Sequence, residues 1–147
     1  MAAKRQANVI WDGDLMSGSG VVSAATSGAF SDLPVTWGSR TESADGRTSP
    51  EELVASAHAS CFAMALSHGL AEGGNPPERL HVSATVTFGQ VEGGFKVVSS
   101  ELTVRGRVPG LDQAGFREAA EAAKDGCPIS GALKGNVELS VEATLES

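Results

Sequence analysis

Two cysteines are the side chains of this sequence best suited to covalent chemistry. Cys61 lies within a long apolar stretch, and Cys127 lies between Gly126 and Pro128. A thiolate is a strong nucleophile, and two thiols can interconvert with a disulfide. The cysteines lie far apart in the sequence and form no CxxC motif, so the sequence alone does not bring their sulfurs together.

Each cysteine also has a purely structural interpretation. Free cysteine packs well in protein cores, and Cys61 lies on the apolar side of a predicted helix. The middle of a helix gives a thiolate no help from the positive N-terminal end, so Cys61 needs another source of stabilisation. Cys127 is a plausible N-cap, where backbone N–H groups stabilise a thiolate. Its structural alternative is a small residue at a tight turn.

Two other classes of site have less support. Zinc could use His58, Cys61 and Cys127, and His58 lies three residues before Cys61, a permissible ligand spacing on a helix. However, the sequence has no CxxC or HxxxH motif, so we expect no metal site. It also lacks the G-x-S-x-G motif of serine hydrolases. A non-catalytic rival remains: a small-ligand-binding or stress-related protein with inert cysteines.

Length, charge and the N-terminus define the setting of these residues. The chain has 147 residues and a net charge of −7. This length predicts a single domain over residues 1–147, and the acidic charge argues against nucleic acid or anionic membranes as partners. No signal peptide and no run of about 18 apolar residues is seen. We therefore expect a cytoplasmic protein, in which a disulfide is more often catalytic than structural.

A long helix is predicted to carry Cys61. It begins at Ser49, which can cap it, with Pro50 at the first helical position and Glu52 completing a capping box. Apolar residues then recur at helical spacing until Gly73 and Gly74 end the helix. At about 1.5 Å per residue the helix is about 33 Å long. It is apolar on more than one face, which indicates a central, buried helix.

Strands and a second helix surround this element. Alternation of apolar and polar residues predicts strands at 81–88, 95–108 and 137–145. Short apolar runs between glycines predict strands at 6–11 and 20–25 and, less clearly, at 35–42. A helix is expected over 112–124, and a short turn or helix from Cys127 to Leu133. The prediction is an α+β fold, with a mostly antiparallel sheet around a buried helix.

Four segments of the chain resemble the OsmC/Ohr family, and the resemblance covers nearly the whole sequence. The segment from Thr48 to Ser67, TSPEELVASAHASCFAMALS, looks like that family's central-helix motif. The segment from Gly126 to Lys134, GCPISGALK, looks like its second-cysteine motif. WDGD at residues 11–14 and VPGLD at 108–112 also fit, and the wording around both cysteines is closer to the OsmC branch than to the Ohr branch.

The resemblance implies a hydroperoxide reductase with a two-cysteine site. The family's peroxidatic cysteine falls on Cys61, its resolving cysteine on Cys127, its glutamate on Glu51 and its arginine on Arg40, with Arg47 as the alternative. Ser49 stands where the family often has Asn, which retains helix capping. The implied cycle forms a Cys61 sulfenic acid and then a Cys61–Cys127 disulfide, which an external dithiol reduces, without metal, haem or flavin.

The predicted helix poses a geometric problem for this site. Glu51 and Cys61 are ten residues apart, which is about 15 Å along the axis of one helix. Two such helices packed antiparallel could bring Glu51 of one chain to Cys61 of another, as the family's intertwined homodimer implies. The resemblance also implies an apolar pocket for an organic hydroperoxide. Candidates to line it are Phe30, Leu33, Trp37, Phe62 and Met64.

Overall fold

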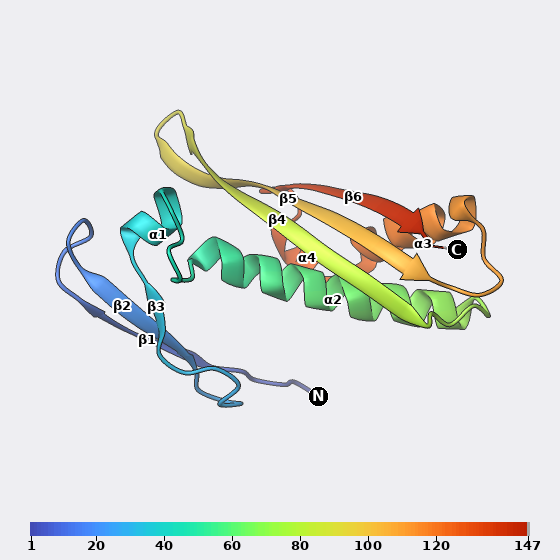
Figure 1. The fold of residues 1–147 in the computed structure, drawn as a ribbon, viewed down its shortest axis with the longest axis horizontal. Helices are drawn as coiled ribbons and strands as arrows, with labels where there is room; N and C mark the ends of the chain where they lie inside the picture. Colours follow the sequence, from blue (N-terminus) through green and yellow to red (C-terminus); the bar gives the residue numbers. More distant parts are fainter. Residues whose placement is uncertain (147) are drawn as a thin grey trace. The chain divides into compact units, whose positions relative to one another are not determined.

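The fold is known from a computed structural model that describes residues 1–146. The chain divides into two compact units, Met1–Leu53 and Val54–Ser147, which are described in turn. The prediction of a single domain over residues 1–147 stays a prediction. The α+β class is confirmed, since helices and short sheets both occur along the chain (Figure 1).

The first unit is a small antiparallel sheet followed by a short helix. Its strands β1 (Ala7–Asp12), β2 (Ser19–Ala24) and β3 (Leu33–Val35) pair in the order β1-β2-β3. The predicted strand at 35–42 is wrong after Val35, because helix α1 (Trp37–Thr41) begins there. Thr36 and Ser39 form a capping box, each accepting a hydrogen bond from the other's backbone N–H at 3.0 Å. This local bonding favours a helix over a strand.

Helix α2 (Pro50–Glu72) has the predicted bounds. The N–H of Glu52 donates to Ser49 Oγ at 3.1 Å, and Gly74 follows the helix with a φ of +89°. The helix is buried along one stripe rather than all round: Phe62 and Leu66 are 0% exposed, whereas Met64 is 72% exposed. The sequence predicted no membrane span, but the length of this helix and its mean hydropathy of 1.3 would suit one. Its buried stripe belongs to the core of the second unit.

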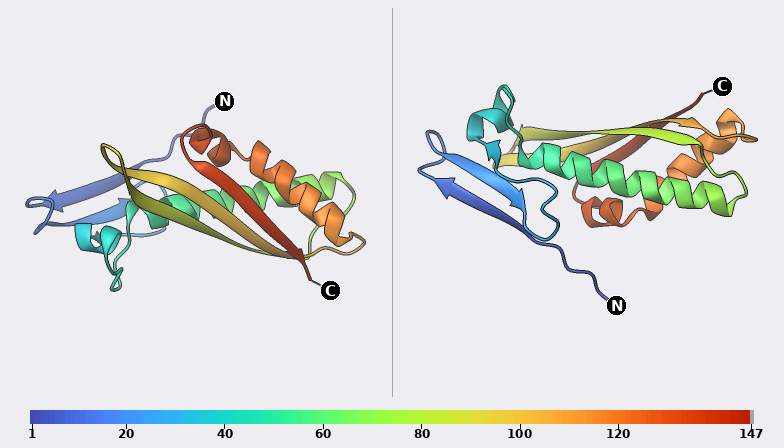
Figure 2. Two further views of the ribbon diagram at one scale, coloured as in Figure 1. Left: turned by 90° about the horizontal axis from the view of Figure 1, so that it is seen from above. Right: turned by 60° about the horizontal axis from the view of Figure 1, so that its bottom comes forward.

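The second unit contains a mixed three-stranded sheet. Strands β4 (Arg79–Val91) and β5 (Gly94–Arg107) form an antiparallel hairpin, and β6 (Glu138–Leu145) pairs with β5 in parallel. A parallel neighbour needs a crossover, which helices α3 (Gln113–Gly126) and α4 (Pro128–Leu133) provide. Figure 2 shows the strands running side by side, with α3 next to β6.

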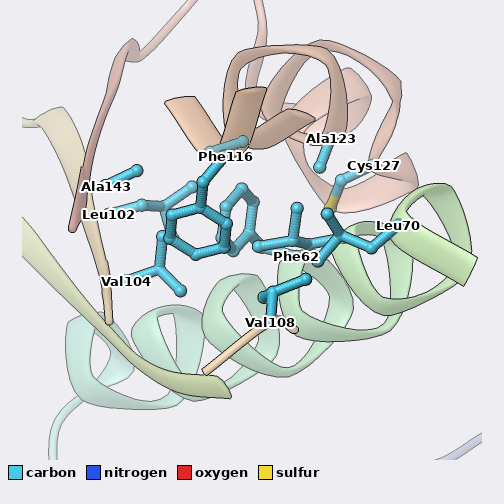
Figure 3. Packing of buried hydrophobic residues seen from close by; sticks show 11 residues of the cluster. Phe62, Leu70, Leu102, Val104, Val108, Phe116, Ala123, Cys127 and Ala143 are labelled. Carbon is cyan, nitrogen blue, oxygen red and sulfur yellow. The ribbon is translucent and has the colours of Figure 1, made fainter. Parts of the chain in front are cut away.

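The core of the second unit lies between this sheet and its helices. Leu102 and Val104 of β5 are 1% and 2% exposed, whereas Thr103 between them faces outward. They pack against Phe62 of α2 and Phe116 of α3, as Figure 3 shows. Fully burying such a side chain contributes about 1.5–3 kcal/mol. Cys127 belongs to the same cluster, so one of the two thiols lies at the edge of the core.

Candidate active site

The two cysteines meet in the second unit. Cys61, on α2, is half-buried, and Cys127 is 1% exposed. Cys127 ends α3 and is the N-cap of α4, with the extended backbone (φ −64°, ψ 127°) expected of a cap. Both are free thiols, and their side chains hydrogen-bond to each other. The fold therefore brings together two sulfurs that no sequence spacing could pair.

The surroundings of Cys61 disfavour its thiolate. Burial raises the pKa of Cys61, and the hydrogen bond to Cys127 raises it further, while the N–H of Ile129 acts in the opposite direction. None of these influences is a cationic side chain. A thiolate in the middle of a helix needs a stabilising charge nearby. Within this unit, Cys61 has none among these influences.

Cys127 has the opposite balance. Burial raises the pKa of Cys127, but hydrogen bonds from the Cys61 thiol, from the N–H and hydroxyl of Ser130, and from the N–H of Ile129 together lower it. When one proton leaves the pair, these donors favour the negative charge on Cys127. A charged Cys127 beside a half-exposed Cys61 is the arrangement in which Cys127 can attack an oxidised Cys61.

Arg40 and Glu51 form a bidentate ion pair in the first unit. Arg40 Nε lies 3.0 Å from Glu51 Oε1, and Arg40 Nη2 lies 2.9 Å from Glu51 Oε2. The Arg40 side chain is 29% exposed and that of Glu51 is 9% exposed. Arg40 Cζ also lies 6.0 Å from the centre of the Trp37 ring. The short helix α1 and the first turn of α2 thus hold one guanidinium in a fixed orientation.

An apolar cavity of about 340 Å³ lies beside this ion pair. Its walls come from the first unit and are apolar, except for Thr36 and Arg40. The wall residues are Val9, Trp11, Leu15, Val22, Val35, Thr36, Trp37, Arg40, Pro50 and Leu53. A cavity of this kind can hold a small organic group with its polar end at the guanidinium.

The predicted pocket residues are mostly elsewhere. Trp37 lines the cavity, but Phe30 and Leu33 do not. Phe62 is fully buried in the core of the second unit, and Met64 is exposed, so neither of them lines this cavity. The wall residues come from strands, helices and the segments between them, and nothing in the sequence pattern marks the side that faces a cavity.

Arg47, the alternative arginine, has a different environment. It pairs with Asp45 at 3.3 Å, and both side chains are exposed, at 44% and 82%. It does not line the apolar cavity. An exposed ion pair of this kind contributes little to stability and does not hold the guanidinium in one orientation. The geometry therefore favours Arg40 as the arginine that could act on a ligand.

His58 is a buried polar residue whose role the sequence did not indicate. It is 0% exposed, its Nδ1 lies 2.6 Å from Ser100 Oγ, and its Nε2 lies 2.8 Å from Ser130 Oγ. Both ring nitrogens are thus engaged by hydroxyl groups, which does not favour a zinc ligand. Among residues 1–146, no group of three or more His, Cys, Asp or Glu side chains could hold a metal ion. Only the spacing of His58 from Phe62 and Leu66 hinted that it faces the core.

The chain is similar to known proteins over most of its length. The family model described as OsmC-like protein matches residues 43–142. Peroxiredoxin OsmC of Escherichia coli is 37% identical over 142 residues, which cover 97% of this chain and 98% of the relative. An organic hydroperoxide resistance protein of Xanthomonas axonopodis is 33% identical over 95 residues, 64% of this chain and 65% of the relative.

A solved structure has the same fold. The organic hydroperoxide resistance protein OhrB of Bacillus subtilis superposes with a TM-score of 0.73 at 28% identity, over 95% of this chain and 98% of that one. The residues matched by the family model, 43–142, include both cysteines and Glu51, whereas Arg40 lies before them.

Proposed function

The chain belongs to the OsmC-like protein family, and from that premise we propose that it is a cysteine-based peroxidase that reduces organic hydroperoxides, with hydrogen peroxide as a second candidate substrate. The names of its relatives, a peroxiredoxin and organic hydroperoxide resistance proteins, support this activity. The observation that carries the proposal is the hydrogen-bonded pair of free thiols, Cys61 and Cys127.

In the first step, the Cys61 thiolate attacks the terminal oxygen of the hydroperoxide. An S–O bond forms, the O–O bond breaks, and the alkoxide leaves and takes up a proton to become an alcohol. Cys61 is oxidised to a sulfenic acid, and the peroxide is reduced. Cys61 is the better candidate for this role because it is the more exposed of the two thiols.

In the second step, Cys127 resolves the sulfenic acid. Its thiolate attacks Cys61 Sγ, a disulfide forms, and hydroxide leaves and takes up a proton to become water. The direct contact of the two thiols and the lowered pKa of Cys127 support this assignment. An external dithiol then reduces the disulfide by thiol–disulfide exchange. These steps use side chains alone, and we assign no metal or organic cofactor.

Arg40 and Glu51 are proposed to complete the site. The guanidinium would stabilise the Cys61 thiolate and polarise the O–O bond, because arginine keeps its charge at neutral pH. Glu51 holds the fork of Arg40, and the adjoining apolar cavity would hold the organic group of the substrate. Helix α2 is continuous from Glu51 to Cys61, which separates them by about 15 Å along its axis.

We therefore assign the guanidinium at each Cys61 to a second copy of the chain. A homodimer with two shared sites would bring Arg40 and Glu51 of one subunit to Cys61 of its partner. Exposed apolar residues on α2 and on the first unit, including Met64, Val9 and Ile10, support an interface of this kind. We expect the dimer to act as a soluble protein in the cytoplasm, where dithiol reductants are available.

Stopped-flow oxidation of the thiols tests the activity directly. The reduced protein is mixed with cumene hydroperoxide and, in a parallel sample, with hydrogen peroxide. We expect both thiols to be consumed per equivalent of peroxide, faster with the organic substrate. A protein with inert cysteines would leave both thiols intact, and this result would favour the non-catalytic, ligand-binding alternative.

The Cys127→Ser variant tests the resolving step. Cys61 should still react with the peroxide but should stop at the sulfenic acid, because its partner thiol is missing. Mass spectrometry after one equivalent of peroxide should show added oxygen on Cys61. Normal cycling of this variant with a dithiol would show that resolution does not require Cys127.

A further inference from the structure

A chain of three buried side chains ends at Cys127. Ser100 of β5, His58 of α2 and Ser130 of α4 are 0%, 0% and 2% exposed. His58 joins the two hydroxyl groups at 2.6 Å and 2.8 Å, and the Ser130 hydroxyl in turn hydrogen-bonds to the Cys127 sulfur. Three elements, β5, α2 and α4, thus contribute one continuous line of hydrogen bonds to the proposed resolving thiol.

Only a few protons are available for the hydrogen bonds that link Ser100, His58, Ser130 and Cys127. Burial lowers the pKa of His58, so its ring is neutral and carries a single N–H. If Nε2 carries the proton, His58 donates to Ser130, and the Ser130 proton is free to point at Cys127. If Nδ1 carries it, Ser130 must donate to Nε2 and has no proton left for Cys127. A negative sulfur at Cys127 favours the first arrangement.

We propose that His58 is a positioning residue for the resolving step: through its Nε2–H it orients the Ser130 hydroxyl as a hydrogen-bond donor to the Cys127 thiolate. Ser100 supports this arrangement by donating to Nδ1, which leaves the proton on Nε2. The assignment rests on the proposed function, in which Cys127 attacks the oxidised Cys61. His58 itself touches neither the peroxide nor the sulfur atoms that react.

The other titratable groups near Cys127 are few. From α2, Cys61 hydrogen-bonds to it directly, and His58 reaches it through Ser130. Ser130 also lines a cavity of about 190 Å³, together with Lys124 and Asp125 of α3 and Lys134 after α4. Lys124 forms ion pairs with Glu121 at 2.9 Å and with Asp125 at 3.9 Å, which balance its charge. A substitution at His58 would therefore affect Cys127 mainly through the hydrogen bond that the Ser130 hydroxyl makes to its sulfur.

The role of His58 can be tested without any peroxidase assay. In a Cys61→Ser background, Cys127 is the only thiol, and its thiolate absorbance in the ultraviolet is followed against pH. Two further substitutions are compared: His58→Leu, which removes both ring nitrogens, and His58→Gln, whose amide N–H₂ can still donate to Ser130. Ser130→Ala, which removes the donor itself, is the third.

We expect His58→Leu and Ser130→Ala to raise the pKa of Cys127 by about one unit, as loss of one hydrogen bond to a charged acceptor predicts. His58→Gln should stay close to the parent. An unchanged pKa in either His58→Leu or Ser130→Ala, or equal shifts in the Leu and Gln variants, would overturn the proposal. If His58→Leu does not fold, as thermal unfolding would reveal, His58→Ala, which also removes both ring nitrogens, takes its place in the comparison with His58→Gln.

The same substitutions in the chain with both cysteines separate the two steps. Disulfide formation after one equivalent of peroxide should be about tenfold slower in His58→Leu and Ser130→Ala at neutral pH, while oxidation of Cys61 keeps its rate. A merely structural role would slow both steps together and contradict the proposal. If no variant, nor the parent, consumes peroxide, the proposed function fails, while the titration of Cys127 still decides the role of His58.

Discussion

The unit Met1–Leu53 and the unit Val54–Ser147 contain different parts of the proposed site. The first holds Arg40, fixed by Glu51 beside an apolar cavity, and contains no cysteine. The second holds both cysteines, but burial and Cys127 raise the pKa of Cys61 there. In the proposed mechanism, the first unit supplies the positive charge and the room for an organic group, and the second supplies the nucleophile.

This contrast shows why neither unit suffices as a peroxidase. A thiol with a raised pKa is a poor nucleophile at neutral pH, and a guanidinium in an apolar cavity can bind a hydroperoxide without reducing it. Rate enhancement requires the charge and the nucleophile in one place. The following predictions test the division of roles, from the largest expected effect to the smallest.

Loss of the nucleophile should have the largest effect. Cys61→Ser should reduce peroxide consumption at least about a thousandfold, because a serine hydroxyl has no accessible anion at neutral pH. Steady-state consumption of cumene hydroperoxide measures it. Thermal unfolding should change little, because Cys61 is only partly buried. Substantial remaining turnover would remove Cys61 from the role assigned to it.

Mixing two inactive variants should restore activity. Glu51→Ala impairs the first unit and Cys61→Ser the second, so each homodimer should be nearly inactive. In a heterodimer with shared sites, both damaged residues fall in one site and leave the other native. Activity should approach half of the wild-type value per heterodimer after subunit exchange. Absence of recovery despite exchange, verified by mass spectrometry, would place the whole site within one chain.

Removal of the charge should slow oxidation of Cys61 about a hundredfold, a typical cost of losing one electrostatic donor in an active site. Arg40→Met tests this by stopped-flow measurement, and Arg40→Lys should not restore the rate, because lysine cannot reproduce the bidentate pair with Glu51. Arg47→Met is the matched control: its ion pair is exposed, and it should behave like the parent. Equal losses in Arg40→Met and Arg47→Met would contradict the assignment.

The pH dependence of the same variant should reveal the environment of the thiol. Burial raises the pKa of Cys61, so without Arg40 the thiol stays protonated at neutral pH. The oxidation rate of Arg40→Met should therefore increase about tenfold per pH unit until the pH exceeds the pKa of Cys61. The parent should show a flatter profile around neutral pH. Parallel profiles for the two proteins would mean that Arg40 does not lower the pKa of Cys61.

The sequence predicted the elements that carry strong local signals. Capping residues fixed the start of α2, two glycines fixed its end, and alternation fixed β4, β5 and β6. It failed at 35–42, where the capping box of Thr36 and Ser39 competes with apolar residues typical of a strand. It also gave no sign that β6 pairs in parallel with β5, because register between distant strands is decided by packing and not by local pattern.

The candidate site was predicted unevenly for a related reason. The cysteines, Arg40 and Glu51 came from motifs, and the structure adds the ion pair between Arg40 and Glu51. The line from Ser100 through His58 to Ser130 was missed, because its members lie on three elements and no local motif marks any of them. The cavity wall was missed for the same reason: it is assembled from several elements.

The smallest effect should come from the wall of the cavity. Leu53 lies in the first turn of α2 and lines the apolar cavity beside Arg40. Leu53→Ala removes apolar contact with the organic group but leaves the charge in place. We expect kcat/KM for cumene hydroperoxide to fall about tenfold, since small changes in an apolar pocket change transition-state binding by about 1–3 kcal/mol. Hydrogen peroxide, which has no organic group, should react at nearly the parental rate.

The ratio of the two substrates makes this result specific. A general loss of folding or of the thiolate would lower both rates and leave their ratio unchanged, whereas loss of apolar contact lowers only one. Val91→Ala is the control, because Val91 is 38% exposed at the end of β4 and lies outside the cavity wall. An unchanged ratio in Leu53→Ala would mean that the organic group binds elsewhere, and the first unit would then contribute its charge alone.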